Sequence, residues 1–381
     1  MYFHLDLVIR KVEKIAMSPI FALIKRGLAL TSFSFFTLKP RLKEFLQIRI
    51  LGKHKIVRVQ KVAENSSPKK IAILALFPRG SLLISTLRLI DQLIINDYQV
   101  IAVVNDGTLK YQEWLIELEA RDITILTRPN IGRDFGAYQA GIQYMQNMPS
   151  YATVERMVLA NDSLYYFPSS TEFLDELLMD SDSWYGMYVN FHIHIHAQSF
   201  FESFDRAIFT SKSFLNFWSA YYPTNIRHNV IYKGEAGLTA TLVASGHFPR
   251  AFITPLLIES SPKFKNFTVE EKYAMWNGFG FTAHEFNLRS EEISILQFRR
   301  IFSHLNPSHH AGIISTRILG APLKLDLLRT GLNSLHGIME IAALSGIQGD
   351  ELRQFELEMS SRGSDASVTG LHKLWRTYGF E

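Results

Sequence analysis

Apolar and polar residues alternate in blocks along the central part of the chain, and these blocks predict strands and helices in turn. Continuous apolar runs rich in β-branched residues are typical of strands buried on both faces of a parallel sheet. Apolar residues repeated every three or four positions are typical of helices, and Ser81 is placed to cap the first of them. The pattern predicts strands at 70–77, 98–108, 122–128 and 154–163, and helices at 80–94, 109–120, up to about 144, and 170–180.

This strand–helix repetition predicts an α/β fold, a Rossmann-type and mostly parallel sheet with helices on both faces. Ligands of such sheets bind in the crevice at the carboxyl ends of the strands. The polar loops "FPRGS", "NDGT", "NIGRDFG" and "NDS" all follow predicted strands. We therefore expect these four loops to converge on one site.

The stretch "NIGRDFGAYQAG" at residues 130–141 combines three glycines with an arginine and an aspartate. It is either an ordinary helix start with Asp134 in the first turn, or a loop shaped for a ligand to approach the backbone. Its position beside the other polar loops favours the ligand reading. The stretch is neither G-x-G-x-x-G nor a P-loop, which argues against a dinucleotide-dependent dehydrogenase.

Composition narrows the class of protein. The chain has 381 residues, of which 47% are apolar and 20% are charged, and it has no cysteine. Disulfides, thiolate metal sites and a cysteine nucleophile are thereby excluded, and a cytoplasmic protein is expected. Residues 1–20 lack an apolar core followed by a small-residue cleavage site, so the sequence predicts no cleavable signal peptide.

Positive charge is concentrated at the N-terminus. Residues 1–61 hold 13 of the 40 Lys and Arg residues but 3 of the 36 Asp and Glu residues. A basic leader on an acidic body is unlike a nucleic-acid-binding domain, so no nucleic acid is expected. Lys25 and Arg26 lie in the middle of the apolar stretch 15–38, which disfavours a membrane span. Two alternatives remain: amphipathic segments on an anionic membrane surface at its inner face, or a helical subdomain packed on the body.

The domain organisation follows from these changes in composition. Residues 1–61 form the basic amphipathic leader, and "KVAENSSPKK" at 61–70 is typical of a linker. The α/β domain occupies 70–330, and a helical tail is expected at 331–381.

Five motifs in colinear order give a resemblance to a known family. These are "NIGRDFGAYQAG", "LANDSLYYFP", "HAQSFFESF", "GEAGLTATLVASG" and "NPSHHAGIISTRILGAPLKLDLL". Together they resemble the rhamnan synthesis protein F family, and the order of strands and polar turns resembles the nucleotide-sugar half of GT-A glycosyltransferases. The resemblance covers roughly residues 70–330. It implies a GT-A-like enzyme that transfers a deoxyhexose such as rhamnose from a nucleotide-diphosphate donor to a surface polysaccharide, lipopolysaccharide or lipid-linked acceptor.

The resemblance also implies roles for single residues. Glu235 lies where inverting GT-A enzymes carry their general base, which takes the proton of the acceptor hydroxyl. Arg133 and Lys324 could stabilise the leaving diphosphate. The residues expected to bind the donor are Asp106, Asn130, Gly132, Arg133, Asp134, Gly136, Asn161, Asp162, His196, Gln198, His309 and Lys324.

The expected metal site departs from the wider pattern. Asn161, Asp162 and Ser163 stand where GT-A enzymes have Asp-x-Asp, so Asp162 alone supplies a carboxylate. Mg²⁺ or Mn²⁺ would need diphosphate oxygens and water as further ligands. The alternative function is a non-catalytic protein of the same fold that binds a nucleotide sugar or a glycan.

Each assignment has a structural alternative. Asp106 could be a turn former, and Asp162 could simply end a strand. Asp134 could be a helix cap, and Glu235 a first-turn acid favoured by the helix dipole. His192, His194 and His196 alternate in "HIHIHAQ", but a zinc site would need a further ligand, and we do not expect one.

Overall fold

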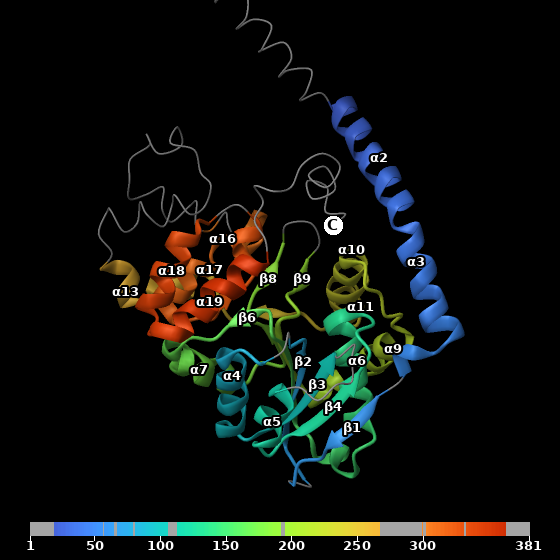
Figure 1. The fold of residues 1–381 in the computed structure, drawn as a ribbon, viewed down its shortest axis with the longest axis horizontal. Coiled ribbons are helices and arrows are strands. Elements are labelled where there is room, and N and C mark those ends of the chain that lie inside the picture. Colours follow the sequence, from blue (N-terminus) through green and yellow to red (C-terminus); the bar gives the residue numbers. More distant parts are fainter. Residues whose placement is uncertain are drawn as a thin grey trace, which may run out of the picture.

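The computed structural model describes residues 19–55, 57–64, 67–78, 81–105, 113–191, 195–266, 299, 302–330 and 333–362. An eight-stranded mixed sheet lies at the centre (Figure 1). Its strands, in spatial order, are β1 (Arg58–Lys61), β4 (Thr124–Arg128), β3 (Tyr98–Asn105), β2 (Lys70–Leu76), β5 (Arg156–Asn161), β10 (Phe201–Asp205), β7 (Trp184–Gly186) and β11 (Arg250–Ala251). The expected α/β class with a mostly parallel sheet is confirmed.

The four central strands are parallel, as their apolar runs predict. In β2, for example, Ile71 to Leu76 are all buried, which matches a strand covered on both faces. β1 and β10 pair antiparallel with β4 and β5. The chain builds β2, β3 and β4 outward in one direction and then crosses to place β5 on the other side of β2. A crevice is expected where the order reverses, at the carboxyl ends of β2 and β5.

Helices cover both faces of the sheet (Figure 1). One face packs on α4 (Ile84–Ile95), α5 (Glu113–Glu119), α7 (Thr171–Met179), α12 (Pro255–Ser260), α13 (Pro262–Lys265) and α17 (Gly312–Leu319). The other packs on α6 (Arg133–Gln146), α8 (Arg206–Phe209), α9 (Lys212–Ala220) and α11 (Ala236–Val243). Ser81 does not cap α4: that helix begins at Ile84, with Leu83 at the cap position and no side-chain cap.

Short elements complete the edge of the sheet where the crevice lies. A π-helix, η5 (Val230–Glu235), joins α10 (Arg227–Asn229) to α11. Two small strand pairs are formed by β6 (Leu164–Tyr165) with β12 (Leu323–Lys324) and by β8 (Val189–Asn190) with β9 (His196–Ala197). The remaining short helices are η3 (Pro149–Thr153), η4 (Pro168–Ser170), α16 (Pro307–His310) and η7 (Leu327–Thr330).

The described part of the expected C-terminal tail, residues 333–362, packs on the body. α18 (Leu335–Leu344) and α19 (Gly349–Ser361) pack with β6 and β12 in a third core cluster, in which Phe355 and Met359 are fully buried. Arg88 of α4 makes a two-pronged ion pair with Glu351 of α19, at 2.6 and 2.7 Å. The boundary at residue 331 therefore does not separate a domain.

The described part of the leader, from residue 19 onward, packs on the body. It comprises α2 (Pro19–Phe36), α3 (Leu38–Phe45), a π-helix η1 (Leu46–Ile50) and a 3-10 turn η2 (Lys53–Lys55), and it leads directly into β1. Residues 58–61, expected to end the leader, thus belong to the sheet. Glu44 is buried and accepts hydrogen bonds from Thr224 Oγ1 at 3.0 Å and from the Asn225 main-chain N–H at 2.5 Å. Within the described residues, no helix has both the length and the apolar character needed to cross a membrane.

Candidate active site

A hydrogen-bonded cluster of five side chains lies at the carboxyl edge of the sheet. Ser199 Oγ donates to Glu235 Oε1 at 2.9 Å and also lies 3.4 Å from Asp134 Oδ2. Asn161 Nδ2 donates to the same Asp134 oxygen at 3.2 Å. On its other side Glu235 is paired with His196, with Nε2 3.2 Å from Oε2. Two carboxylates, a hydroxyl, an amide and an imidazole are thus joined in one network.

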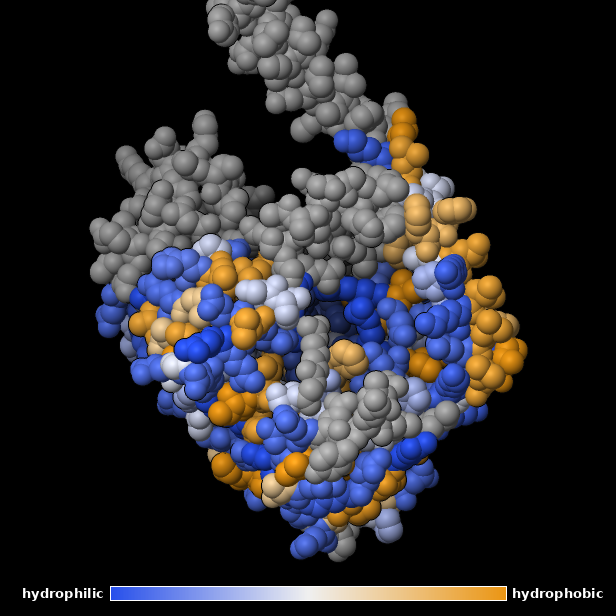
Figure 2. Space-filling view, viewed as in Figure 1, coloured by the Kyte–Doolittle hydropathy of each residue, from blue (hydrophilic) through white to orange (hydrophobic). Residues whose placement is uncertain are grey.

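The five residues come from four separate parts of the chain. Asn161 ends β5, His196 begins β9, and Ser199 lies in the turn before β10. Asp134 is in the first turn of α6, and Glu235 is the last residue of η5. A hollow with hydrophilic colouring is visible between α16–α19 on one side and α10–α11 on the other (Figure 2).

The backbone turn before α6 fixes the position of Asp134. Gly132 has φ +87° and Arg133 has φ +52°, a left-handed conformation that glycine adopts without strain. A Cβ on Gly132 would lie 2.5 Å from Pro223 Cβ, so a larger residue cannot replace it without movement. The Gly132 N–H donates to Asn225 Oδ1 at 2.6 Å. The same Asn225 is held by Glu44, so the leader supports this turn.

A buried arginine ties this turn to the sheet. Arg128, the last residue of β4, donates from Nη1 to Asn105 Oδ1 and from Nη2 to the Ile131 carbonyl, both at 2.7 Å. Burial lowers the pKa of Arg128 to about 10. A Cβ on Gly136 would lie 2.9 Å from this guanidinium and 2.2 Å from the Ile131 oxygen. The glycine is therefore required by packing.

Glu235 is placed by the π-helix that carries it. π-helical turns widen a helix locally and are frequent at functional sites. The preceding residue, Gly234, would bring a Cβ to 3.0 Å from the ring of Phe135, so glycine allows η5 to pack closely against α6. This contact brings the two carboxylates onto the same network although 101 positions of the chain, 134 to 235, separate them.

The surroundings drive the pKa values of the two carboxyl groups apart. Burial raises the pKa of Asp134, and the nearby charge of Glu235 raises it further. Burial alone would raise the pKa of Glu235 too, but the hydrogen bond and charge of His196, with Ser199 and Lys324, outweigh it and lower that pKa. Glu235 is therefore held as a carboxylate while Asp134 takes up a proton more readily. Such separated pairs are typical of acid–base sites.

Cationic side chains lie next to the cluster. The ammonium of Lys324 is 4.6 Å from the centre of the Phe200 ring, and its charge lowers the pKa of both Glu235 and Asp326. Asp326 itself is contacted by Arg227 Nη2 at 3.3 Å and by His309 Nε2 at 3.4 Å. Burial lowers the pKa of His309, so its ring is neutral near pH 7. This side of the site carries more positive than negative charge and suits a diphosphate.

The structure brings some of the predicted residues together and sets others apart. Asp134, Asn161, His196 and Glu235 lie in one network with Lys324 nearby, and Gln198 Nε2 donates to Asn306 Oδ1 at 3.1 Å. Four other predicted residues lie outside this network. Arg133 is exposed, and the Asn130 carbonyl accepts a hydrogen bond from Asn225. Gly132 allows the turn before α6, and Gly136 allows the close packing of that turn. Asp106, His192 and His194 lie outside the described residues.

Sequence reasoning missed four polar residues of this region. Arg128 is the last residue of an apolar strand, so its burial was not expected from the sequence. Asp326 follows Lys324 by two positions in "LKLD", in the turn after β12, and only that closeness in sequence pointed to it. Arg227 and Glu202 carry no local signal.

The donor set at Asp162 does not fit a metal site made by the protein alone. Asp162 Oδ2 accepts the Phe77 N–H at 2.6 Å, and burial raises the pKa of this carboxyl, which favours its neutral form. Among the described residues, no group of three or more His, Cys, Asp or Glu side chains is placed to hold a metal ion. No step proposed below therefore passes through a metal.

Comparison with known proteins gives one family match. Residues 100–278 match the model of a family described as rhamnan synthesis protein F. This confirms the predicted resemblance over that stretch, which includes Asp134, Asn161, His196 and Glu235; the motif from 306 to 328 lies beyond it. All five residues of the cluster thus fall within the matched region, and Lys324 and its neighbours lie beyond it.

Two individual proteins are also similar. The uncharacterized protein y4gN of Sinorhizobium fredii (strain NBRC 101917 / NGR234) is 26% identical over 181 residues, which are 46% of this chain and 46% of that protein. The chain thus spans about half the length of this curated relative. The mannosyltransferase PcManGT from Pyrobaculum calidifontis, solved in complex with GDP-Man and Mn²⁺, has a TM-score of 0.31 and 10% identity, covering 89% of this chain and 98% of that one. Similarity at this level does not establish a common fold.

Proposed function

From the match to the rhamnan synthesis protein F family over residues 100–278, we propose that this protein is a glycosyltransferase of polysaccharide assembly. Its donor would be a nucleotide-diphosphate deoxyhexose, rhamnose or a close relative. The acceptor would be a growing cell-surface glycan, a lipopolysaccharide or a lipid-linked glycan. The observation that carries the proposal is the Glu235 carboxylate, which is kept ionised by His196 and Ser199 at the edge of the sheet where ligands of this fold class bind.

The proposed reaction is a single inverting displacement. The acceptor hydroxyl oxygen attacks the anomeric carbon of the donor while Glu235 removes its proton, so a carbon–oxygen bond forms on one face of the sugar. The bond to the diphosphate oxygen breaks on the opposite face, and its electron pair leaves with the nucleotide diphosphate. Lys324 and Arg133 would offset the charge that develops on this leaving group. Asp134 and Asn161 would position the sugar hydroxyls.

The cationic side chains support a diphosphate position near the proposed base. Lys324 lies near enough to Glu235 to lower its pKa, and near enough to Asp326 and His309 to affect theirs. A diphosphate bound to Lys324 would therefore lie within the same crevice as the proposed base. If Mg²⁺ or Mn²⁺ joins the donor, it would neutralise diphosphate charge, with diphosphate oxygens and water as its main ligands and Asp162 as the carboxylate that the family resemblance assigns to it.

The leader supports a position at a membrane surface. Apolar side chains on α2, α3 and η1 are exposed, and the basic residues of the leader accompany them. We propose that the protein lies peripherally on the cytoplasmic face of the cell membrane, held by shallow insertion and by attraction to anionic lipid. This position would bring the crevice to a membrane-attached acceptor.

A non-catalytic binding protein is the alternative, and one observation favours it. Asp162 is the lone carboxylate of its turn and is already bonded to the Phe77 N–H. A panel of nucleotide-diphosphate sugars, with and without Mg²⁺ or Mn²⁺, distinguishes the two functions. We expect one donor to raise the melting temperature and to be consumed when a glycan acceptor is added. A donor that binds saturably but is neither hydrolysed nor transferred would support the alternative.

A further inference from the structure

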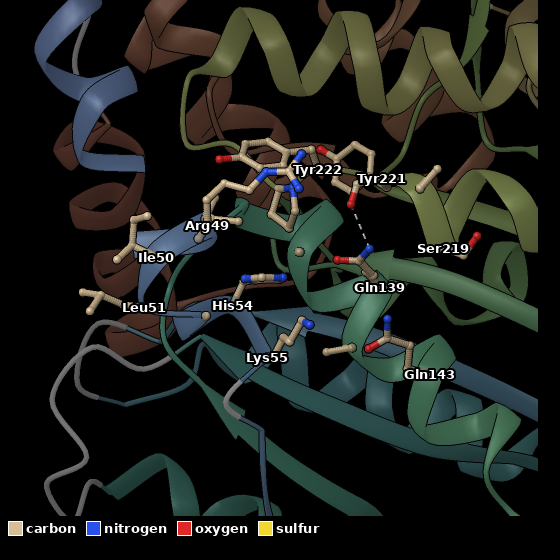
Figure 3. Close-up of a pocket in the computed structure, with 16 residues that line it drawn as sticks. Arg49, Ile50, Leu51, His54, Lys55, Gln139, Gln143, Ser219, Tyr221 and Tyr222 are labelled. Carbon is tan, nitrogen blue, oxygen red and sulfur yellow. Dashed lines mark hydrogen bonds between the residues drawn. The ribbon is translucent and has the colours of Figure 1, made fainter. Parts of the chain in front are cut away.

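A cavity lies between the leader and the body, and none of the five residues of the Glu235 cluster lines it. It has a volume of about 630 Å³ and is enclosed by η1 and η2 of the leader, by α6, and by the chain that follows α9 (Figure 3). Arg49, His54 and Lys55 line it from the leader, and Gln139 and Gln143 line it from α6. Such a volume holds a small ligand.

The lining of this cavity carries basic side chains and no acidic one. Arg49, His54 and Lys55 are present, whereas the lining residues include no Asp or Glu. His54 Nδ1 is buried and has no hydrogen-bond partner among the described residues. Burial lowers the pKa of His54, and the charges of Lys55, Arg128 and Arg49 lower it further, so its ring is neutral near pH 7 while three cationic groups lie near it. Their mutual repulsion would be relieved by a bound anion.

The geometry of the basic side chains suits a phosphate group. In Figure 3 His54 and Lys55 extend from the leader toward Gln139 and Gln143, and Arg49 lies against the ring of Tyr222, 4.9 Å from its centre. Arginine and lysine are the usual ligands of phosphate, and a guanidinium stacked on a ring keeps its N–H groups in a fixed plane.

A strip of exposed apolar side chains ends at this cavity. Ile50 and Leu51 lie at its edge and point away from the basic side chains (Figure 3). Figure 2 shows apolar colouring along α2 and α3. The exposed members of the strip are Ile24, Leu28, Leu30, Phe35, Phe36, Leu38, Leu42, Phe45, Leu46, Ile50 and Leu51. An unpaired surface of this extent is unusual for a protein that lies free in water.

We propose that the cavity lined by Arg49, His54 and Lys55 binds the phosphate headgroup of an anionic membrane lipid whose acyl chains lie along the apolar strip of the leader. The proposal rests on the membrane-surface part of the proposed function and is independent of the transfer reaction. An inorganic phosphate would satisfy the basic groups but not the strip. A lipid has a phosphate for the basic groups of the cavity and acyl chains for the adjoining apolar strip.

The test uses a lipid that dissolves as single molecules, so that the surface potential of a membrane does not contribute. We expect full-length protein to bind dihexanoyl phosphatidylglycerol saturably below its micelle concentration, with a rise in melting temperature. Dihexanoyl phosphatidylcholine, whose headgroup has no net charge, and inorganic phosphate, which lacks acyl chains, should bind at least about tenfold more weakly. Phosphate bound as tightly as the lipid would mean a free-anion site and would overturn the proposal.

Matched variants locate the site. Arg49→Gln with Lys55→Gln removes two charges from the cavity and should weaken lipid binding by about tenfold or more. Lys39→Gln with Lys43→Gln removes two exposed charges of the same leader outside the cavity and should leave binding within about twofold of the wild type. Gln143→Glu, which places a carboxylate in the α6 wall, should also abolish binding. Equal binding by the first variant and the wild type would refute the site.

An assay of sugar transfer distinguishes failure of the lipid site from failure of the proposed enzymatic function. With a soluble acceptor, the Arg49→Gln/Lys55→Gln variant should transfer sugar at the wild-type rate, because neither residue belongs to the Glu235 cluster. A protein that binds the lipid but transfers no sugar would refute the enzymatic proposal and keep the lipid site. A protein that transfers sugar but binds no lipid would refute the lipid site and keep the enzymatic proposal.

Discussion

At the scale of single residues, Glu235 is defined by its two partners. Ser199 donates to one carboxylate oxygen at 2.9 Å and His196 lies 3.2 Å from the other. Both contacts stabilise the charged form, so the group remains a base at a pH where a buried carboxyl group alone would be protonated. Asp134, which shares Ser199 with it, is affected in the opposite direction. The network therefore contains one ready base and one carboxyl group that can hold a proton.

His196 should set the acid limit of activity. A general base works when deprotonated, so the rate falls as the pH drops through its pKa. His196 lowers the pKa of Glu235, and His196→Gln should therefore move the acid limb of the kcat/KM profile to higher pH. Measurement of kcat/KM from pH 4 to 8 checks this. A limb that stays in place or moves to lower pH would show that Glu235 is not the titrating base.

Glu202 should make stability depend on pH. It is buried on β10, where Trp184 Nε1 donates to it at 3.1 Å, and burial raises its pKa from 4.5 to about 8. Because the folded protein holds this proton more tightly than the unfolded chain does, stability should fall by a few kcal/mol as the pH rises from about 4.5 to 8. Glu202→Gln, an isosteric neutral group, should remove this fall.

Urea unfolding of both proteins at several pH values tests the role of Glu202. The two should be similar near pH 5, and the Gln variant should be the more stable near pH 8.5. A difference between the two proteins that stays constant over this interval would show that the buried group is ionised throughout.

At the scale of elements, the start of α6 shows why short motifs are hard to interpret from sequence. Each of the three glycines of "NIGRDFGAYQAG" is required by a different feature of the structure. Gly132 permits the left-handed turn, Gly136 admits the Arg128 guanidinium, and Gly141 lets the helix approach the sheet, where a Cβ would lie 2.3 Å from Ile73 Cγ2. Asp134 then follows in the first turn, so the helix-start and ligand interpretations describe the same residues.

A pair of glycine substitutions separates packing from ligand contact at this element. Gly136→Ala forces a Cβ against the Ile131 oxygen and should lower the free energy of unfolding by about 1–3 kcal/mol. Gly27→Ala adds the same methyl group within α2, where no atom lies within 4 Å, and should raise it by about 0.5–1 kcal/mol. Denaturant titration measures both. A Gly136→Ala protein of wild-type stability that has lost donor binding would instead favour the predicted donor contact.

At the scale of the whole molecule, the hydrophobic pattern was sufficient to predict the central strands of the sheet but not the strands at its edges. Strands β2, β3, β4 and β5 are long apolar runs, and their predicted positions are confirmed to within a few residues. β7, β11 and β9 have two or three residues each, too few for a periodic signal. β1, "RVQK", is a polar edge strand that resembles a linker.

The candidate site was predictable to the extent that its residues follow strands. Asn161 is the last residue of β5, and Asp134 lies in the first turn of the helix that follows β4, at the edge where the topology of a parallel sheet brings loops together. Glu235 and Lys324 were placed through the family resemblance, because no local pattern links residues so distant along the chain. Their meeting depends on long-range packing, such as Gly234 against Phe135, which a single sequence does not encode in any short window.

The leader adds a mechanical link between the expected membrane surface and the site. Glu44 of α3 holds Asn225, and Asn225 holds the turn at Gly132 from which α6 begins. The chain from Asn225 continues through α10 and η5 to Glu235. The docked leader thus contacts the supports of both carboxylates. The predicted alternatives of a surface-bound and a body-packed leader are compatible, since one face packs and the other exposes apolar side chains.

The turnover number of Glu235→Gln tests the central claim most directly. The amide keeps the shape of the side chain and can still accept from Ser199, so donor affinity and melting temperature should stay close to the wild-type values. Loss of the base should lower kcat by about 10²–10⁴ with a competent acceptor. Full turnover in the Gln variant, measured beside the wild type with the same donor and acceptor, would contradict the account.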